Sequence, residues 1–231
     1  MAGIFYGIGV GPGDSELLTV KATKMLQKVD VIIAPKTEKK EGSVALRIAK
    51  PYLKDDIEIC YQVFPMVKNF QNDASSWEEN KNEIIEFLNA GKNVAFLTLG
   101  DPMFYSTYIY ILRLLQKDGI NIETVPGIPA YIAIAAKYNW PIVEGDDILS
   151  VIPATANSED IKAALKVSKS AVLMKVYRNF DDVRETLTEN DMADNAILVS
   201  RLGLDDEKQI DVKTAENLKL NYLSTILARR K

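Results

Sequence analysis

Near its N-terminus the chain carries Gly7-Ile8-Gly9-Val10-Gly11-Pro12-Gly13-Asp14. This stretch ends an apolar run of strand length, residues 4–10, and it is followed by residues 16–29, in which apolar side chains recur at helical spacing. A buried strand, a glycine-proline turn and an amphipathic helix in this order predict the first half of a β-α-β unit. The turn is therefore expected at the carboxyl end of a parallel strand, the edge of an open α/β sheet where ligands bind.

Two later turns repeat this arrangement. Val94–Leu99 predicts a strand that stops at Gly100-Asp101-Pro102, and Ile120–Val125 predicts one that ends at Pro126-Gly127. In the common strand order of such sheets the first and fourth strands are neighbours, so the first two turns are expected to flank one crevice. Glycine at these points lets a ligand approach the backbone, and a helix start offers N–H groups to an anion. The same residue types also dominate ordinary turns.

The two halves of the chain differ in pattern. Up to about residue 125, strands alternate with helices, which predicts a parallel sheet with right-handed crossovers. Beyond residue 140 only two helices are expected, 158–167 and 180–187, among five strands: Ser150–Pro153, Ala171–Val176, Ala196–Arg201, Gln209–Lys213 and Leu223–Ala228. We therefore predict an α/β protein of two α/β domains, 1–126 with a mainly parallel sheet and 127–231 with a mixed sheet, and a boundary within about 126–140.

The amino-acid composition excludes several classes of active site and binding site. The 231 residues include no histidine and one cysteine, Cys60, and carry a net charge of −4. Ser-His-Asp and Cys-His hydrolases, histidine general bases, intrachain disulfides and cysteine-based metal knots are thereby excluded, and no protein-bound metal is expected. The net negative charge gives no general attraction for nucleic acid or anionic lipid. No signal peptide and no apolar run long enough to span a bilayer are visible, so we expect a cytoplasmic protein that does not bind membranes.

The first loop lacks the dinucleotide fingerprint. Pro12 stands where the third glycine is required, and the second strand, ending Ala34-Pro35-Lys36, lacks the acidic residue that binds a ribose. A P-loop motif is also absent from the sequence. A nucleoside-like ligand without a pyrophosphate remains compatible with these loops.

The three turns together resemble a known family. The segments GIGVGPGDSELLTVKA (7–22), LTLGDPMFYST (97–107) and VPGIPA (125–130) are similar in order and spacing to the tetrapyrrole methylases, and the resemblance covers essentially the whole chain. Within that family the chain looks most like the C20-methyltransferases of cobalamin synthesis, on the basis of residues 31–53, 100–112, 172–179 and 222–230. Uroporphyrinogen-III methylases carry an acidic residue where this chain has Pro35, which argues against that earlier step.

The resemblance implies a homodimeric, class III methyltransferase-like enzyme that binds S-adenosylmethionine in the cleft between its two domains. It would methylate C20 of a tetrapyrrole, either metal-free precorrin-2 or cobalt-factor II. Carried over by position, the residues that bind the cofactor would be Pro12, Leu99, Gly100, Asp101, Met103, Phe104, Pro129, Ala130, Met174, Leu218, Ser224 and Thr225. A backbone-ordering role in its turn suits Asp101 better than an acid or base role, and no catalytic residue is identified.

The implied acceptor carries eight carboxylates and should meet cations. We expect its contacts at Lys36, Tyr108, Lys175, Arg178 and Arg201. Tyr105, Tyr108 and Tyr110 cannot all lie on one helix face, so at least one of them should pack elsewhere. Methyl transfer from a sulfonium to an electron-rich carbon needs no protein nucleophile, so a chain without histidine is compatible with it. Other readings stay open: another corrin position, the diphthamide precursor on a translation factor, or a nucleoside-binding module without catalysis.

Overall fold

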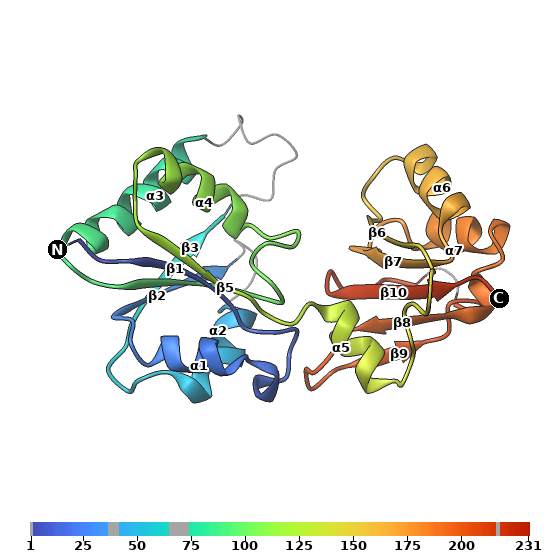
Figure 1. Ribbon diagram of the computed structural model, residues 1–231, viewed down its shortest axis with the longest axis horizontal. Helices are drawn as coiled ribbons and strands as arrows, with labels where there is room; N and C mark the ends of the chain where they lie inside the picture. The colour runs from blue at the N-terminus through green and yellow to red at the C-terminus, as the bar shows by residue number, and fades with distance from the viewer. Residues whose placement is uncertain (1, 37–41, 65–73, 216–217) are drawn as a thin grey trace. The chain divides into compact units, whose positions relative to one another are not determined.

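The computed structural model describes residues 2–36, 42–64, 74–215 and 218–231. The chain forms two compact units, Met1–Pro129 and Ala130–Lys231. Each unit is an α/β structure built on its own five-stranded sheet (Figure 1). The first sheet is parallel and the second is mixed, so the predicted fold class is confirmed.

The first sheet has the order β3-β2-β4-β1-β5. Its strands are β1 (Phe5–Gly9), β2 (Val31–Lys36), β3 (Glu58–Val63), β4 (Val94–Thr98) and β5 (Ile122–Val125). β1 lies between β4 and β5, and all three run in the same direction. The loops that follow these three strands therefore leave the sheet side by side at its carboxyl edge.

Helices cover both faces of the first sheet. Figure 1 shows α1 (Val20–Leu26) and α2 (Val44–Ala49) on one face, and α3 (Ala74–Asn89) and α4 (Tyr108–Lys117) on the other. Because side chains alternate along a strand, each face has its own apolar core. On the α1–α2 side it includes Ile8, Leu26, Ile32 and Leu97, and on the α3–α4 side Phe5, Ile84, Phe96 and Leu115. Short 3-10 helices, Ser15–Leu17 and Lys50–Tyr52, complete the described elements of this unit.

Two helices start later than the apolar spacing predicts. α1 begins after Thr19, whose hydroxyl accepts a hydrogen bond from the Ala22 N–H at 3.1 Å and caps the helix. The sequence predicts a helix over 105–116, but α4 begins at Tyr108, because Tyr105 has the left-handed φ of 48°. The residues in front of α4 therefore remain in the loop after β4.

Pro35 does not end its strand, although the apolar run 31–34 predicts a short strand that stops at this proline. β2 pairs with β3 as far as Lys36, but with β4 only from Val31 to Ile33. Pro35 thus lies where one side of the strand has no ladder partner among the described strands. A residue without an N–H is tolerated at such a position.

The second sheet has the order β6-β7-β10-β8-β9. Its strands are β6 (Leu149–Pro153), β7 (Ser170–Met174), β8 (Ala196–Ser200), β9 (Lys208–Ile210) and β10 (Ser224–Arg229). β6 and β7 are parallel, and the other neighbours are antiparallel. β9 is shorter than its predicted range of 209–213.

Three α-helices are described in the second unit: α5 (Ala130–Lys137), α6 (Ser158–Val167) and α7 (Phe180–Glu189). α6 begins where the Asn157 side chain accepts from the Asp160 N–H at 2.8 Å. One apolar core joins β6, β7, β8 and β10 to α6, α7 and the 3-10 helix Ala193–Asn195. Across the described residues of both units, every helix is too short or too polar to cross a membrane.

Candidate active site

The loops that follow β1 and β4 are joined through their backbones. The Val10 N–H donates to the Thr98 carbonyl at 2.9 Å, and the Gly100 N–H donates to the Gly11 carbonyl at 2.8 Å. Gly11 and Gly100 thereby form an isolated antiparallel bridge beyond the ends of their strands. The bridge fixes two of the three glycine-rich loops against each other.

The loop after β5 packs onto the other two at glycine positions. A Cβ atom on Gly9 would lie 2.6 Å from the Gly127 nitrogen, and one on Gly127 would lie 2.1 Å from the Gly100 carbonyl oxygen. Both distances are shorter than any van der Waals contact, and the obstructing atoms are backbone. The three loops can meet only because these two residues have no side chain.

Asp101 joins the loop after β4 to the loop after β5. One oxygen of its carboxylate accepts from the Met103 N–H at 2.8 Å, and the other accepts from the Gly127 N–H at 3.0 Å. The first hydrogen bond orders the turn after β4 and the second ties it to the loop after β5. With both oxygens engaged by backbone donors, the carboxylate orders the backbone in this structure.

The predicted cofactor residues of the first unit gather around these loops. Pro12 and Gly100 are buried, Leu99 and Phe104 are half-buried, and Met103 is 54% exposed. Pro129 reaches the same place, with its Cα 3.8 Å from the position of a Cβ on Gly100. Ala130 follows directly and begins α5.

The predicted cofactor residues of the second unit gather at one edge of its sheet. Met174 is the register partner of Thr225, and Ser224 is the partner of Ser200. Ser224 is 1% exposed, and its hydroxyl donates to the Asn221 carbonyl at 2.7 Å. Leu218 lies outside the helices and strands and is 39% exposed.

Tyr108 does not meet an acceptor, and that prediction is wrong. Its side chain is 0% exposed and lies between the rings of Phe5 and Phe96, with centroids 6.0 and 5.8 Å away. Its hydroxyl is hydrogen-bonded to Thr124 Oγ1 at 2.7 Å, and burial raises its pKa. The apolar residues at helical spacing turn this face of α4 toward the core, while Tyr105 and Tyr110 stay exposed.

The four predicted acceptor cations lie at the ends of strands. Lys36 ends β2, and its ammonium lies 5.7 Å from the centroid of the Tyr61 ring. Lys175 and Arg178 follow β7, and Arg201 follows β8, where it forms an ion pair with Asp206 at 2.5 Å. Lys175 is half-buried, and burial lowers its pKa.

The single cysteine, Cys60, has a raised pKa. Burial raises the pKa of Cys60 to about 12, with further contributions from a hydrogen bond and the charge of Glu83. The thiolate is therefore scarce at neutral pH, and it is the thiolate that reacts.

Asn179 has a structural role that the sequence analysis missed. Its side-chain N–H donates to the Ala154 carbonyl at 2.9 Å and ties the loop after β7 to the loop after β6. The signal was present, because asparagine directly before a predicted helix is a common cap or turn residue. Here it joins loops instead of capping α7.

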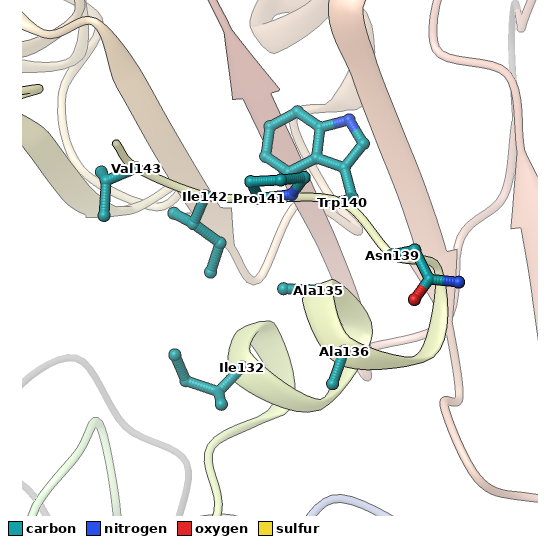
Figure 2. Close-up of a pocket in the computed structure, with 8 residues that line it drawn as sticks. All are labelled: Ile132, Ala135, Ala136, Asn139, Trp140, Pro141, Ile142 and Val143. Atoms are coloured by element: carbon teal, nitrogen blue, oxygen red, sulfur yellow. The ribbon is translucent and has the colours of Figure 1, made fainter. Parts of the chain in front are cut away.

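An apolar hollow of about 530 Å³ lies elsewhere, in the second unit. Figure 2 shows Ile132, Ala135 and Ala136 of α5 on one side and the segment Trp140–Val143 on the other. None of the predicted site residues lines it, and its lining contains no charged side chain. We therefore place the chemistry at the glycine-rich loops and not at this hollow.

Comparison with known proteins identifies the family. The sequence pattern of the tetrapyrrole (corrin/porphyrin) methylases matches residues 5–218. The chain belongs to this family. It is 34% identical to the cobalt-precorrin-2 C(20)-methyltransferase of Salmonella typhimurium, over 100% of this chain and 98% of the relative. It is 33% identical to a precorrin-2 C(20)-methyltransferase of Sinorhizobium sp, over 86% of this chain and 84% of the relative.

The fold is that of a methylase as well. A solved structure of a cobalt precorrin-4 methyltransferase aligns with a TM-score of 0.74 and 22% identity, covering 98% of this chain and 94% of that one. The chain is thus an enzyme of the tetrapyrrole methylase family with that family's α/β fold.

The loops of this methylase fit the cationic donor S-adenosylmethionine. Residues 9–14, 99–107 and 125–130 contain Asp14 and Asp101 but no lysine or arginine. A phosphate would find no cation there, whereas a sulfonium meets no like charge. The nearest atoms to a Cβ on Gly100 are at 3.8 and 4.0 Å, so the backbone at this glycine is not overpacked.

Proposed function

We propose that this methylase transfers a methyl group from S-adenosylmethionine to C20 of a tetrapyrrole in cobalamin biosynthesis. The arrangement that carries the proposal is the meeting of three glycine-rich loops, locked by Asp101 and free of basic residues. The position of methylation and the pathway are supported by the two relatives, which are named for C20-methylation of precorrin-2 in its cobalt and metal-free forms.

The chain's own part in the reaction is positioning. S-adenosylmethionine would supply the electrophilic methyl group to an electron-rich carbon of the acceptor. The methyl–sulfur bond would break as the carbon–carbon bond forms, S-adenosylhomocysteine would leave, and the acceptor carbon would lose its proton. The backbone at Gly100 and Leu99, the turn held by Asp101, and the side chains of Met103 and Phe104 would fix the donor and limit its contact with water. Correct orientation alone lowers such a barrier by roughly 7–11 kcal/mol. No step requires a histidine or a thiolate from the protein.

The decisive experiment is methyl transfer with a defined acceptor. The protein is incubated with ¹³C-methyl S-adenosylmethionine and, in parallel, with precorrin-2 and cobalt-factor II, and the labelled carbon is located by NMR. Label at C20 supports the proposal and the faster acceptor is assigned as the substrate. Label at another ring position, or none with either acceptor, contradicts it.

Gly100→Arg tests the donor site separately. The larger side chain would occupy the space at the loops, so we expect calorimetry to show no binding of S-adenosylmethionine. The matched control is Gly119→Arg, because Gly119 has a similar positive φ (69° against 72°) but open space around it. The control should lose similar stability and keep binding. Normal affinity in Gly100→Arg would place the donor elsewhere.

Other parts of the proposal concern the second unit and the assembly. We keep Met174, Leu218, Ser224 and Thr225 as donor contacts, and Met174→Ala should raise the dissociation constant for S-adenosylmethionine without unfolding the chain.

We also propose a homodimer. Light scattering should then give twice the chain mass of 25.8 kDa, and a mass of one chain would contradict this.

A further inference from the structure

One edge of the second sheet gathers cations and tyrosines from neighbouring strands. Lys175, Tyr177 and Arg178 follow β7, Tyr222 precedes β10, and Arg201 follows β8. The register sets these segments side by side, because Thr225 pairs with Met174 and Ser224 pairs with Ser200. We name these five residues the cation–tyrosine edge.

The two tyrosine rings of this edge meet edge to face, and a cation lies over one of them. The Tyr177 and Tyr222 centroids are 5.2 Å apart at an interplanar angle of 66°, and the Arg178 guanidinium lies 5.1 Å from the Tyr177 centroid. Tyr222 is 37% exposed and Arg178 is exposed. Burial raises the pKa of Tyr222, so its phenol stays neutral and does not repel an anion.

Arg178 and Arg201 differ in their ion-pair partners. Among the described residues Arg178 forms no ion pair, whereas Arg201 is already bound to Asp206. Holding a guanidinium over an aromatic ring orients its planar fork of donors. That geometry suits a carboxylate, which a guanidinium binds through two parallel hydrogen bonds.

The backbone at this edge is strained and firmly held. Lys175 and Arg201, each the first residue after its strand, have φ values of 61° and 58°, in the left-handed region that favours glycine. The loop after β7 is anchored where Asn179 binds the Ala154 carbonyl, and the Arg201 N–H donates to the Leu223 carbonyl at 2.8 Å. Strain maintained by such anchors is typical of residues that are positioned for a ligand.

We infer that the cation–tyrosine edge binds the acceptor, with the flat tetrapyrrole against a tyrosine ring and with Arg178 and Lys175 at carboxylates on its rim. This inference rests on the proposed function and identifies its acceptor-recognition residues. The angle between the two rings allows a planar ligand to lie on one tyrosine and to touch the edge of the other. Tyr177 and Tyr222 enter here as contacts that the sequence analysis did not name.

Binding of two porphyrins tests the inference without turnover. The probes are uroporphyrin, with eight carboxylates, and deuteroporphyrin, with two, and binding is followed by porphyrin fluorescence. Arg178→Gln should weaken uroporphyrin binding about fivefold and deuteroporphyrin binding less. The matched control is Lys162→Gln, an exposed cation of the same unit that pairs with Glu189 and should change neither affinity.

Two substitutions of Tyr222 test whether its aromatic ring contacts the porphyrin. Tyr222→Leu keeps apolar bulk but removes the aromatic face and should weaken both porphyrins about tenfold, whereas Tyr222→Phe should bind as the wild type does. Tyr110→Leu is the control, because Tyr110 is an exposed tyrosine of the first unit. Thermal melting of each variant separates loss of binding from loss of fold.

In turnover, Arg178→Gln and Tyr222→Leu should raise KM for the acceptor and leave KM for S-adenosylmethionine unchanged. Wild-type affinities in folded Arg178→Gln and Tyr222→Leu, or equal losses for donor and acceptor, would overturn the inference, as would a wild-type protein that binds neither porphyrin. If the porphyrins respond as expected but no methyl group is transferred, the recognition edge stands and the proposed function fails.

Discussion

Gly9, Gly100 and Gly127 come from three different loops, yet their backbone atoms touch. The sequence analysis placed each loop at a strand end, because glycine and proline follow an apolar run in all three cases. It could not show that Gly127 lies against Gly9, since this contact depends on β1 standing between β4 and β5. A single methyl group at this point would separate loops that must act together.

Gly127→Ala should therefore lower the free energy of unfolding by about 3 kcal/mol, because its Cβ would meet the Gly100 carbonyl oxygen and the backbone would have to move. Gly119→Ala, with positive φ but open space, should cost only about 1 kcal/mol. Urea denaturation gives both values. Equal losses would mean that the loops yield easily at this contact.

Lys175 gives a second prediction at this scale. Burial lowers its pKa, so the folded state disfavours the charged form and Lys175→Met should raise stability at pH 7. As pH rises from the lowered pKa toward about 10.4, the unfolded state holds the proton longer than the folded state does, and wild-type stability increases. The advantage of Lys175→Met should shrink over this range in urea titrations. A constant difference between pH 7 and pH 11 would contradict it.

At the scale of elements, periodicity located most of the structure. Apolar residues at helical spacing predict helices over 74–89 and 158–167, and these ranges match α3 and α6. The later start of α4 depends on the φ of Tyr105, and the extension of β2 depends on which strands flank Pro35. Neither is a property of the local sequence. The roles of the candidate cofactor residues stay a prediction. Tyr108 was expected to contact a ligand, but it is buried because tertiary packing places its side chain in the core.

One hydrogen-bonded connection between elements contains two groups with shifted pKa values, Glu207 and Tyr138. Glu207, next to β9, accepts hydrogen bonds from Tyr138 Oη at 2.8 Å, from Lys137 at 2.7 Å and from the Gly203 N–H at 2.7 Å, which ties the end of α5 to the loop after β8. Burial raises the pKa of Glu207, but these three donors outweigh it and the net shift is downward. The same carboxylate and burial raise the pKa of Tyr138 to about 12.

Between pH 10 and about 12 the wild type should therefore lose stability relative to Tyr138→Phe. The phenol ionises in the unfolded chain near pH 10 but stays protonated in the folded one, so rising pH favours unfolding. Phenylalanine has no such proton. Urea denaturation across this range checks the difference, and ultraviolet titration should show the Tyr138 pKa falling toward 10 in Glu207→Gln. Parallel stability curves for the two proteins would exclude the tie.

At the scale of the whole molecule, the chain consists of two compact units, each with its own sheet. The first unit has a complete five-stranded sheet with an apolar core on each face, so it needs nothing from the second to bury its strands. The sequence analysis recognised the change from parallel to mixed pairing because helices become scarce after residue 140. The division into domains 1–126 and 127–231 stays a prediction about independent folding.

Residues 1–129 expressed alone should accordingly unfold in a single cooperative transition, because both faces of their sheet are already covered. Residues 1–121, which lack β5 (Ile122–Val125), are the matched control and should lose cooperativity. Circular dichroism during heating distinguishes them. Absence of a transition in the longer fragment would mean that the two units fold only together.

The place of β10 sets an order of events during translation. β10 is the last strand in chain order, yet it stands in the middle of its sheet, between β7 and β8. While the ribosome is still adding residues 126–223, the amino-terminal sheet already possesses all five strands, but β6–β7 and β8–β9 remain two unconnected ribbons with open inner edges. The nascent chain thus exposes unpaired strand edges until β10 emerges. Chaperones that shield unpaired strands should associate with it during that interval.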